Sequence, residues 1–395
     1  MPVLLIAIVA MLVQQTVATA VKVGLPALFP AVAEELAFDP KYVLIYTWVF
    51  SASAVCVMTG CGGVIRRYGA LRTSQLGCVF MASGLACAAT LASPAMLIPA
   101  LGLAAVLISI GATVATPASS QILAAYAPPK WAPLVFSIKQ TGVPAGVAIS
   151  GLVLVPIAVA SGWRATSLGL AVVVLAIAVL LQPLRARFDH DRDPRARPRL
   201  IDFVITIRDV IGQSERRAMA MAAFTFVGIQ SIYTNFTITY LYEDLQFSFE
   251  QAGQVLGVAT LLAIPARVFW GWIGSTFISP RTLLALLAMI MAVSTALMGA
   301  MDAHWSHAAV LGVNCAISLS VLSWHGVLLA EAARLAPLGE VGRMTGGILA
   351  FGSAGQLVYP AIFAAAYWIG GYGLAYVAIA VPAAAVGLMF MLRRS

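Results

Sequence analysis

Long apolar stretches, separated by short polar ones, run along this chain from end to end. Apolar residues fill them continuously, without the alternation of polar and apolar positions that marks a half-buried strand. Runs of about 20 apolar residues are typical of helices that cross a bilayer, because a helix satisfies its own backbone hydrogen bonds there. The pattern predicts twelve spans, at residues 3–30, 42–65, 73–92, 96–124, 132–160, 163–183, 218–241, 250–275, 281–301, 306–333, 343–368 and 371–392.

One polar break is much longer than the others. The charged segment from Leu184 to Arg217 holds nine of the 23 lysines and arginines of the chain. We therefore predict an N-terminal bundle of six helices at 1–184, a linker at 185–217 and a C-terminal bundle of six helices at 218–395. Within the linker, the residues 201–208 (IDFVITIR) favour a short amphipathic helix that lies along the inner membrane surface.

The two apolar halves resemble each other when the chain is shifted against itself by 209 residues. At this offset Glu34-Glu35-Leu36 aligns with Glu243-Asp244-Leu245, and Arg72-Thr73 aligns with Arg281-Thr282. Ala127-Pro128 also aligns with Ala336-Pro337. Loop landmarks that keep one offset over so long a stretch indicate two parallel repeats, an arrangement found in transporters that rock around a central site.

The composition agrees with a membrane protein. Hydrophobic residues make up 61% of the chain and charged residues 10%, whereas soluble domains carry about 25% charged residues. The first apolar run lacks a basic segment before it, so we interpret it as an uncleaved first helix. The five cysteines are scattered in apolar runs, without the spacing of a metal site or a disulfide framework, and we expect neither a metal nor a cofactor.

The positive charges are distributed unevenly between alternate loops. If both termini face the cytoplasm, the inner loops and the C-terminal tail hold eighteen basic residues, including Lys130 and Arg281. The outer loops then hold only Lys41 and Arg164, together with acids such as Asp39 and Asp302. This asymmetry is the positive-inside pattern. It predicts a multi-pass protein of the bacterial inner membrane with cytoplasmic termini, and it explains the net charge without nucleic acid as a partner.

The segment after the second span carries a family motif. It reads Gly62-Gly63-Val64-Ile65-Arg66-Arg67-Tyr68-Gly69-Ala70-Leu71-Arg72. This resembles the G-x-x-x-D-R-x-G-R-K motif of the major facilitator superfamily of secondary transporters, with Arg66 at the position of the usual Asp. The phrases FSIKQTGVPAG and LLAEAARLAP are similar to those of a poorly characterised bacterial subgroup. The resemblance implies an all-α fold of twelve transmembrane helices, working in the bilayer, and we expect a monomer.

In that family the motif's Asp helps to hold the two bundles closed on the cytoplasmic side. The replacement by Arg66 leaves two possibilities open: this latch is absent, or another pair forms it. The candidate gating or latch residues are Gly62, Arg66, Arg67, Gly69, Arg72 and Glu331.

Three basic residues inside predicted spans are not explained by topology. They are Lys22, Lys139 and Arg267, and at the 209-residue offset none of them has a charged counterpart. A charge at the bilayer centre costs about 2.5–3.5 kcal/mol on insertion scales, so such residues usually face a cavity or a partner. An anionic substrate would neutralise them. Arg267 also resembles in position the anion-binding arginine of oxalate, monocarboxylate and nitrate porters of the superfamily.

Each cation has a structural alternative. Lys22 could extend to the outer surface, Lys139 could bond loop carbonyls, and Arg267 could pair with Glu331. Polar residues in the spans could complete a substrate site, or could only bond neighbouring helices. These further candidates are Gln15, Ser120, Gln140, Tyr233, Asn235 and His325.

These observations predict a secondary active transporter for a small organic anion, a carboxylate, that works by alternating access. The chain contains no phosphate-binding loop, H-E-x-x-H or G-x-S-x-G motif, so we expect no enzyme activity. Bringing one negative charge into a cell costs about 2.3 kcal/mol per 100 mV, so accumulation needs a co-transported proton or an exchanged anion. His325 and Glu331 are the candidate proton carriers. The alternatives are an efflux carrier for apolar drug-like compounds and a sensor or scaffold with a transporter fold.

Overall fold

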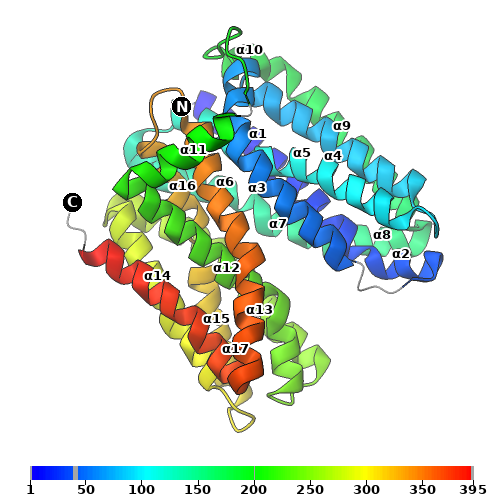
Figure 1. Ribbon diagram of the computed structural model, residues 1–395, viewed down its shortest axis with the longest axis vertical. Helices are drawn as coiled ribbons and strands as arrows, with labels where there is room; N and C mark the ends of the chain where they lie inside the picture. The colour runs from blue at the N-terminus through cyan, green and yellow to red at the C-terminus, as the bar shows by residue number, and fades with distance from the viewer. Residues whose placement is uncertain (1, 39–42, 200, 393–395) are drawn as a thin grey trace. The chain divides into compact units, whose positions relative to one another are not determined.

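The computed structural model describes residues 2–38, 43–199 and 201–392, and this part of the chain is helical without strands (Figure 1). The positions Asp39, Lys41, Arg393 and Arg394, which entered the predicted charge pattern, lie outside the described residues. The longer helices are α1 (Pro2–Ala27), α3 (Val43–Tyr68), α4 (Ala70–Leu91), α5 (Leu97–Tyr126), α9 (Trp163–Leu180), α12 (Ser214–Glu243), α13 (Phe249–Thr276), α14 (Pro280–Ala300), α15 (His307–Val321) and α17 (Val341–Leu392). The shorter ones are α2 (Phe29–Leu36), α6 (Ala132–Gln140), α7 (Gly142–Ile149), α8 (Val155–Ser161), α10 (Arg185–Phe188), α11 (Ile201–Gly212) and α16 (His325–Arg334).

Helices account for all twelve predicted spans. Ten helical segments of the described residues are long and apolar enough to cross a membrane. One of them, α17, has 52 residues and covers the last two predicted spans, and its backbone leaves the helical conformation at Gly370 and Gly371. The span predicted at 218–241 is α12, which is not among the ten because polar residues such as Gln230 and Asn235 interrupt its apolar run. The prediction of an all-α membrane protein is confirmed.

The chain forms two compact units. Unit 1 comprises Met1–Ala127, Lys139–Arg208 and Ala336–Ala350. Unit 2 comprises Pro128–Ile138, Asp209–Leu335 and Phe351–Ser395. Unit 1 therefore includes the first residues of α17, and unit 2 includes most of α6. The domain boundaries at 184 and 218 stay a prediction.

Small residues set the packing in unit 1. Helix α5 packs against α1, α3 and α4, and α4 also lies beside α9 (Figure 1). Gly77 of α4 and Gly111 of α5 face each other so closely that a Cβ on Gly77 would lie 2.8 Å from the carbonyl oxygen of Gly111. Membrane helices associate through such contacts because lipid provides no hydrophobic driving force between them.

Small residues also allow close helix contacts in unit 2. Helix α15 packs against both α13 and α14, and α12 packs against α13. Gly228 of α12 accommodates the ring of Tyr359, and Gly355 of α17 lies against the backbone of Phe224. Larger residues at these glycines would separate the helices.

Two of the predicted spans are broken helices. The span at 132–160 is divided between α6 and α7 at Thr141, and a π-helical stretch, Ser150–Leu154, follows before α8. The span at 306–333 is divided between α15 and α16, and residues 322–324 lie between them. At both interruptions the backbone keeps helical dihedral angles, with φ and ψ of −64° and −17° at Thr141 and of −74° and −23° at Trp324. Both breaks carry candidate site residues, Lys139 beside the first and His325 beside the second.

Arg164 joins three helices of unit 1 through its hydrogen bonds. Arg164 Nε donates to Glu35 Oε1 at 2.7 Å, and its two remaining nitrogens donate to the carbonyl oxygens of Ala89 and Ala92. Trp163 Nε1 donates to the second oxygen of the same glutamate, Oε2, at 2.6 Å. These bonds join α2, the end of α4 and the start of α9.

The substitution Arg164→Ala should therefore destabilise the protein. It removes the donor from one carboxylate and two carbonyl groups, and we expect a loss of about 2 kcal/mol, typical of a hydrogen bond to a charged group on a partly exposed residue. Arg192→Ala removes an exposed arginine of the linker and is the matched control. Thermal unfolding of the purified variants checks this, and equal melting temperatures for both would contradict the assigned role of Arg164.

Candidate functional site

A buried lysine lies at the first helix break. Lys139 is the second-last residue of α6 and is 1% exposed. Its Nζ donates to Gln15 Oε1 on α1 at 2.6 Å, and Thr116 Oγ1 on α5 donates to the same oxygen at 3.1 Å. Gln15 Nε2 in turn donates to Thr19 Oγ1 at 3.4 Å. The ammonium is therefore held by a neutral amide whose other contacts are also neutral.

The Lys139 ammonium forms no ion pair with any residue that the structure describes. A lysine ammonium has three N–H donors, and Gln15 accepts from one of them. Gln14 and Ser120 are also fully buried, at 0% and 1% exposure, and within the described residues their side-chain polar atoms have no hydrogen-bond partner. Unit 1 thus contains buried polar groups whose hydrogen-bonding capacity is unused.

Two glycines bring Lys139 to Gln15. Gly142 and Gly146 lie one turn apart on α7 and face α1. A Cβ on Gly142 would lie 2.9 Å from the carbonyl oxygen of Leu12, and one on Gly146 would lie 2.6 Å from Thr19 Cβ. This Gly-x-x-x-Gly spacing lets the two backbones touch. The sequence run GVPAG therefore fixes the distance between the helices.

Lys22 lies elsewhere on α1. Its side chain is exposed, and its Nζ lies 5.3 Å from the centre of the Phe50 ring. Seven residues separate it from Gln15, which is about 10 Å along a helix. The structure does not bring Lys22 to Lys139. The contact of Lys22 with Phe50 is a cation–π interaction within unit 1.

The candidate residues of unit 2 differ in their surroundings. Arg267 is 3% exposed and lies two residues after Pro265 in α13. His325 begins α16, with its ring stacked on that of Trp324 at a centroid distance of 3.7 Å. Trp270 Nε1 donates to the carbonyl oxygen of Leu319 at 2.8 Å, which holds α13 against α15.

Two polar residues of α12 have local partners. The Tyr233 hydroxyl is buried and donates to the carbonyl oxygen of Asn314 at 3.1 Å, a bond that ties α12 to α15. Asn235 is exposed, and its Nδ2 donates to Ser231 Oγ one turn away at 3.4 Å. These contacts give Tyr233 a structural role and place Asn235 at the surface of unit 2.

Glu331 is engaged in an ion pair at the end of α16. Arg334 binds its carboxylate with two nitrogens, at 2.9 and 2.7 Å, and a second acid, Glu215, lies 4.0 Å from Arg334. Both carboxylate oxygens of Glu331 are therefore occupied by an arginine of its own helix. This geometry stabilises the helix end, because paired Arg–carboxylate hydrogen bonds are strong and directional.

The family motif covers the end of α3 and the start of α4, and it contacts the linker and the start of α17, all within unit 1. A Cβ on Gly62 would lie 2.5 Å from Arg343 Cβ, so this glycine allows α3 and α17 to touch. Arg66 lies 3.4 Å from Asp193 of the linker. Arg67 stacks on the ring of Tyr68 at 5.3 Å.

Gly69 has a left-handed backbone, with φ of +95°, and the Asp189 carboxyl group occupies the space of a side chain there. That carboxylate accepts from the backbone N–H groups of Leu71 at 2.7 Å and Arg72 at 3.0 Å, at the start of α4. Arg72 Nη1 donates to Gln75 Oε1 at 3.4 Å. Burial raises the pKa of Asp189, and the two N–H bonds and Arg185 act in the opposite direction.

Three residues that hold these sites were not identified from the sequence. Thr116 donates to Gln15, and Asp189 and Asp193 fix the motif. Thr116 directly precedes Pro117 in a polar run, and this position in the sequence could have indicated a role in the site. Within the described residues, no group of three or more His, Cys, Asp or Glu side chains is placed to hold a metal ion.

The sequence profile of the Major Facilitator Superfamily matches residues 3–332. The chain belongs to the Major Facilitator Superfamily. It is therefore a transporter rather than an enzyme, and the predicted family, fold and general function of secondary transport are confirmed. No curated protein sequence matches the chain.

Solved structures of this superfamily share the fold at low sequence identity. A bacterial homologue of the iron transporter ferroportin, in an outward-facing state, superposes with a TM-score of 0.82 at 11% identity and covers 98% of both chains. The human organic anion transporter MFSD10 (TETRAN) gives 0.76 at 15% identity, again over 98% of both chains. The Escherichia coli fucose:proton symporter gives 0.75 at 14% identity, also over 98% of both. Iron, organic anions and a sugar are thus cargoes of one fold, so the fold does not define the substrate.

The close contact between α7 and α1 leads to a prediction. Gly146→Val should lower the melting temperature and separate Lys139 from Gln15, because overpacking of this kind costs about 1–3 kcal/mol. Gly169→Val on α9, where a Cβ meets no atom within 4 Å, is the matched control. Thermal unfolding of both variants checks the difference. A Gly146→Val protein as stable as Gly169→Val would refute the role of the glycine pair.

Proposed function

We propose that this member of the superfamily is a secondary active transporter that moves a small organic anion, a carboxylate, by alternating access. The observation that carries the proposal is the Lys139 ammonium, which is buried in unit 1 and bonded to a neutral amide. Its positive charge has no acid to balance it among the described residues.

Energetics support an anionic ligand. A charge inside a membrane protein usually faces a partner or a water-filled cavity, because leaving it unbalanced in the bilayer costs several kcal/mol. The two N–H donors of Lys139 that Gln15 does not use can bind a carboxylate. Gln14 and Ser120 supply further buried polar groups for neutral parts of the same ligand.

Unit 2 contains a candidate cation of its own. Arg267 is buried in α13, and a guanidinium group binds a carboxylate with two parallel hydrogen bonds. His325, at the second helix break, is the candidate for exchanging a proton, because imidazole is the side chain that does so most readily near neutral pH. A proton or an exchanged anion would balance the charge that the substrate carries.

The proposed site differs from that of a carrier for cationic or apolar drugs. Such a carrier is expected to have an acid on its first or fourth span, and the described residues of α1 and α5 contain neither Asp nor Glu. We place the protein in a bacterial inner membrane with both termini in the cytoplasm, because the basic residues concentrate in the linker.

Transport in liposomes tests the proposal. The full-length protein should accumulate at least one compound from a panel of labelled carboxylates, and Lys139→Gln and Arg267→Gln should each reduce uptake at least about tenfold, since a hydrogen bond to a charged group contributes about 1.5–3 kcal/mol. Lys130→Gln, which removes an exposed lysine just before α6, is the matched control and should transport normally. If no carboxylate is moved, or if both site variants transport like the wild type, the proposal fails.

A further inference from the structure

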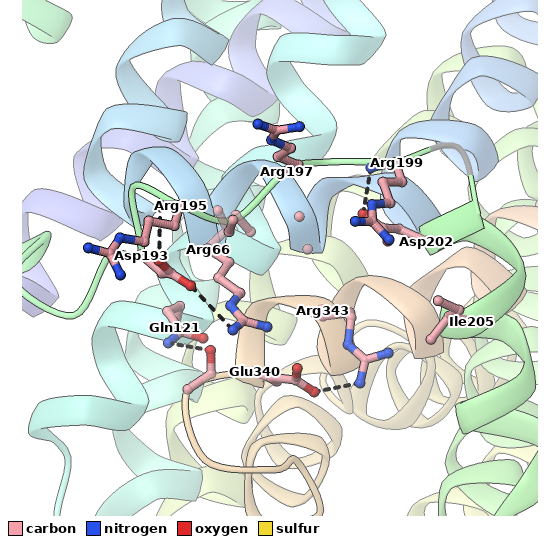
Figure 2. Close-up of a pocket in the computed structure, with 15 residues that line it drawn as sticks. Arg66, Gln121, Asp193, Arg195, Arg197, Arg199, Asp202, Ile205, Glu340 and Arg343 are labelled. Carbon is pink, nitrogen blue, oxygen red and sulfur yellow. Dashed lines mark hydrogen bonds and ion pairs between the residues drawn. The ribbon is translucent and has the colours of Figure 1, made fainter.

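A cavity of about 600 Å³ opens in unit 1 where α3, the linker and the start of α17 meet (Figure 2). We call it the arginine pocket, because five arginines line it: Arg66, Arg195, Arg197, Arg199 and Arg343. Its acidic residues are Asp193, Asp202 and Glu340. The lining therefore carries two more positive charges than negative ones.

The acids of the arginine pocket are already engaged. Asp193 pairs with Arg66 at 3.4 Å and Glu340 pairs with Arg343 at 2.5 Å (Figure 2). Asp202 accepts from the backbone N–H of Arg199 at 2.9 Å. Within the described residues, the guanidinium groups of the three linker arginines of the pocket form no ion pair. These three exposed arginines thus keep N–H donors at the rim of the pocket, where an anion that carries multiple oxygens can bind them.

An apolar cavity of about 320 Å³ lies next to the arginine pocket, also within unit 1. We call it the apolar groove. Its lining includes Val64 of α3, Leu76 and Phe80 of α4, and Ile110 of α5, and Phe203 of α11 lines it as well. A groove of this composition between membrane-spanning helices accommodates hydrocarbon.

The two cavities adjoin at α3 and at the first turn of α11. On α3, Gly60 lines the apolar groove and Gly63 lines the arginine pocket. On α11, Asp202 lines the pocket and Phe203 lines the groove. A Cβ on Gly60 would lie 2.7 Å from the Phe203 ring, and one on Gly63 would lie 2.6 Å from Asp202 Oδ2. The first turn of α11 therefore packs on α3 where the two cavities meet.

Helix α11 also exposes apolar side chains. Ile201 is 56% exposed and Val204 is 64% exposed, on a helix that follows the arginine-rich first part of the linker. A helix with exposed apolar residues next to arginines is typical of the boundary between lipid and water. A lipid bound at such a boundary needs a polar site for its headgroup beside an apolar site for its chain.

We propose that the arginine pocket and the apolar groove together bind one anionic phospholipid. Its phosphate lies among the arginines and an acyl chain lies in the groove. Basic pockets of membrane proteins bind anionic headgroups in this way, whereas a zwitterionic headgroup brings no net negative charge. The lipid holds the first turn of α11 and the Arg343 segment of α17 on α3, because all three border the same ligand.

Binding to the purified full-length protein tests this inference. Three probes are compared by native mass spectrometry and thermal unfolding: phosphatidylglycerol, phosphatidylcholine of the same chain length, and glycerol phosphate, the free headgroup anion. We expect one tightly retained phosphatidylglycerol that raises the melting temperature, and no such effect from the other two probes. The pocket variant Arg195→Gln/Arg197→Gln/Arg199→Gln should bind it at least about tenfold more weakly, because several charge-assisted hydrogen bonds are lost.

The matched control changes three arginines of the same linker that do not line the pocket, Arg187→Gln/Arg192→Gln/Arg208→Gln, and should bind like the wild type. Cys56→Trp, which fills the apolar groove from its exposed side, should also weaken retention, whereas Val159→Trp at an exposed position of α8 should not. Equal loss in both arginine triples would show nonspecific charge attraction and overturn the proposal. Equal protection by glycerol phosphate would identify a soluble anion as the ligand, and retention that is unchanged in the pocket variant and in Cys56→Trp would exclude the site.

Discussion

The hydrogen bond from the Lys139 ammonium to the Gln15 amide, 2.6 Å long, is the interaction on which the candidate site of unit 1 depends. A lysine buried at membrane depth needs a partner, and this one has a neutral amide instead of an acid. The Gly142 and Gly146 contacts bring the two side chains together, and Thr116 holds the amide oxygen in place. The amide satisfies one donor of the ammonium but leaves its charge unbalanced. We propose that this unbalanced charge makes the site complementary to an anion before any anion binds, which is the preorganisation that selective binding requires.

Both units contain a predicted span that is divided between two helices, and both contain close glycine contacts between helices. Lys139 and His325 each lie beside the point where a predicted span is divided between two helices. Small residues let the surrounding helices pack closely, and single hydrogen bonds such as Tyr233 to Asn314 and Trp270 to Leu319 tie neighbouring helices of unit 2. The salt bridges of the described residues, such as Arg164 with Glu35 and Arg334 with Glu331, involve helix ends and loops. Ion pairs thus hold helix ends and loops within each unit, and among the described residues none involves Lys139.

Much of the fold could be predicted from the sequence, because the length and hydropathy of a span are local properties. The positions of the twelve spans and the family motif followed from such local signals, and the lysine of the site was identified because a charge inside an apolar run is conspicuous. Contacts between distant residues could not be predicted. Gln15 and Lys139 are 124 residues apart, and only the packing of α7 on α1 joins them. The sequence likewise did not show that Lys22 lies over Phe50, or that Asp189 occupies the space beside Gly69. The break before α16 contains neither glycine nor proline, so no turn signal marked it.

In the proposed site the charge of Lys139 selects the substrate, and a pair of isosteric ligands tests this most directly. Equilibrium binding of a transported carboxylate is compared with that of its primary amide, which has nearly the same shape but no charge. We predict that the wild type prefers the carboxylate at least about tenfold, and that Lys139→Met, whose unbranched side chain is uncharged and one heavy atom shorter, loses this preference. Equal affinity of the wild type for acid and amide, or a preference that persists unchanged in Lys139→Met, would contradict it.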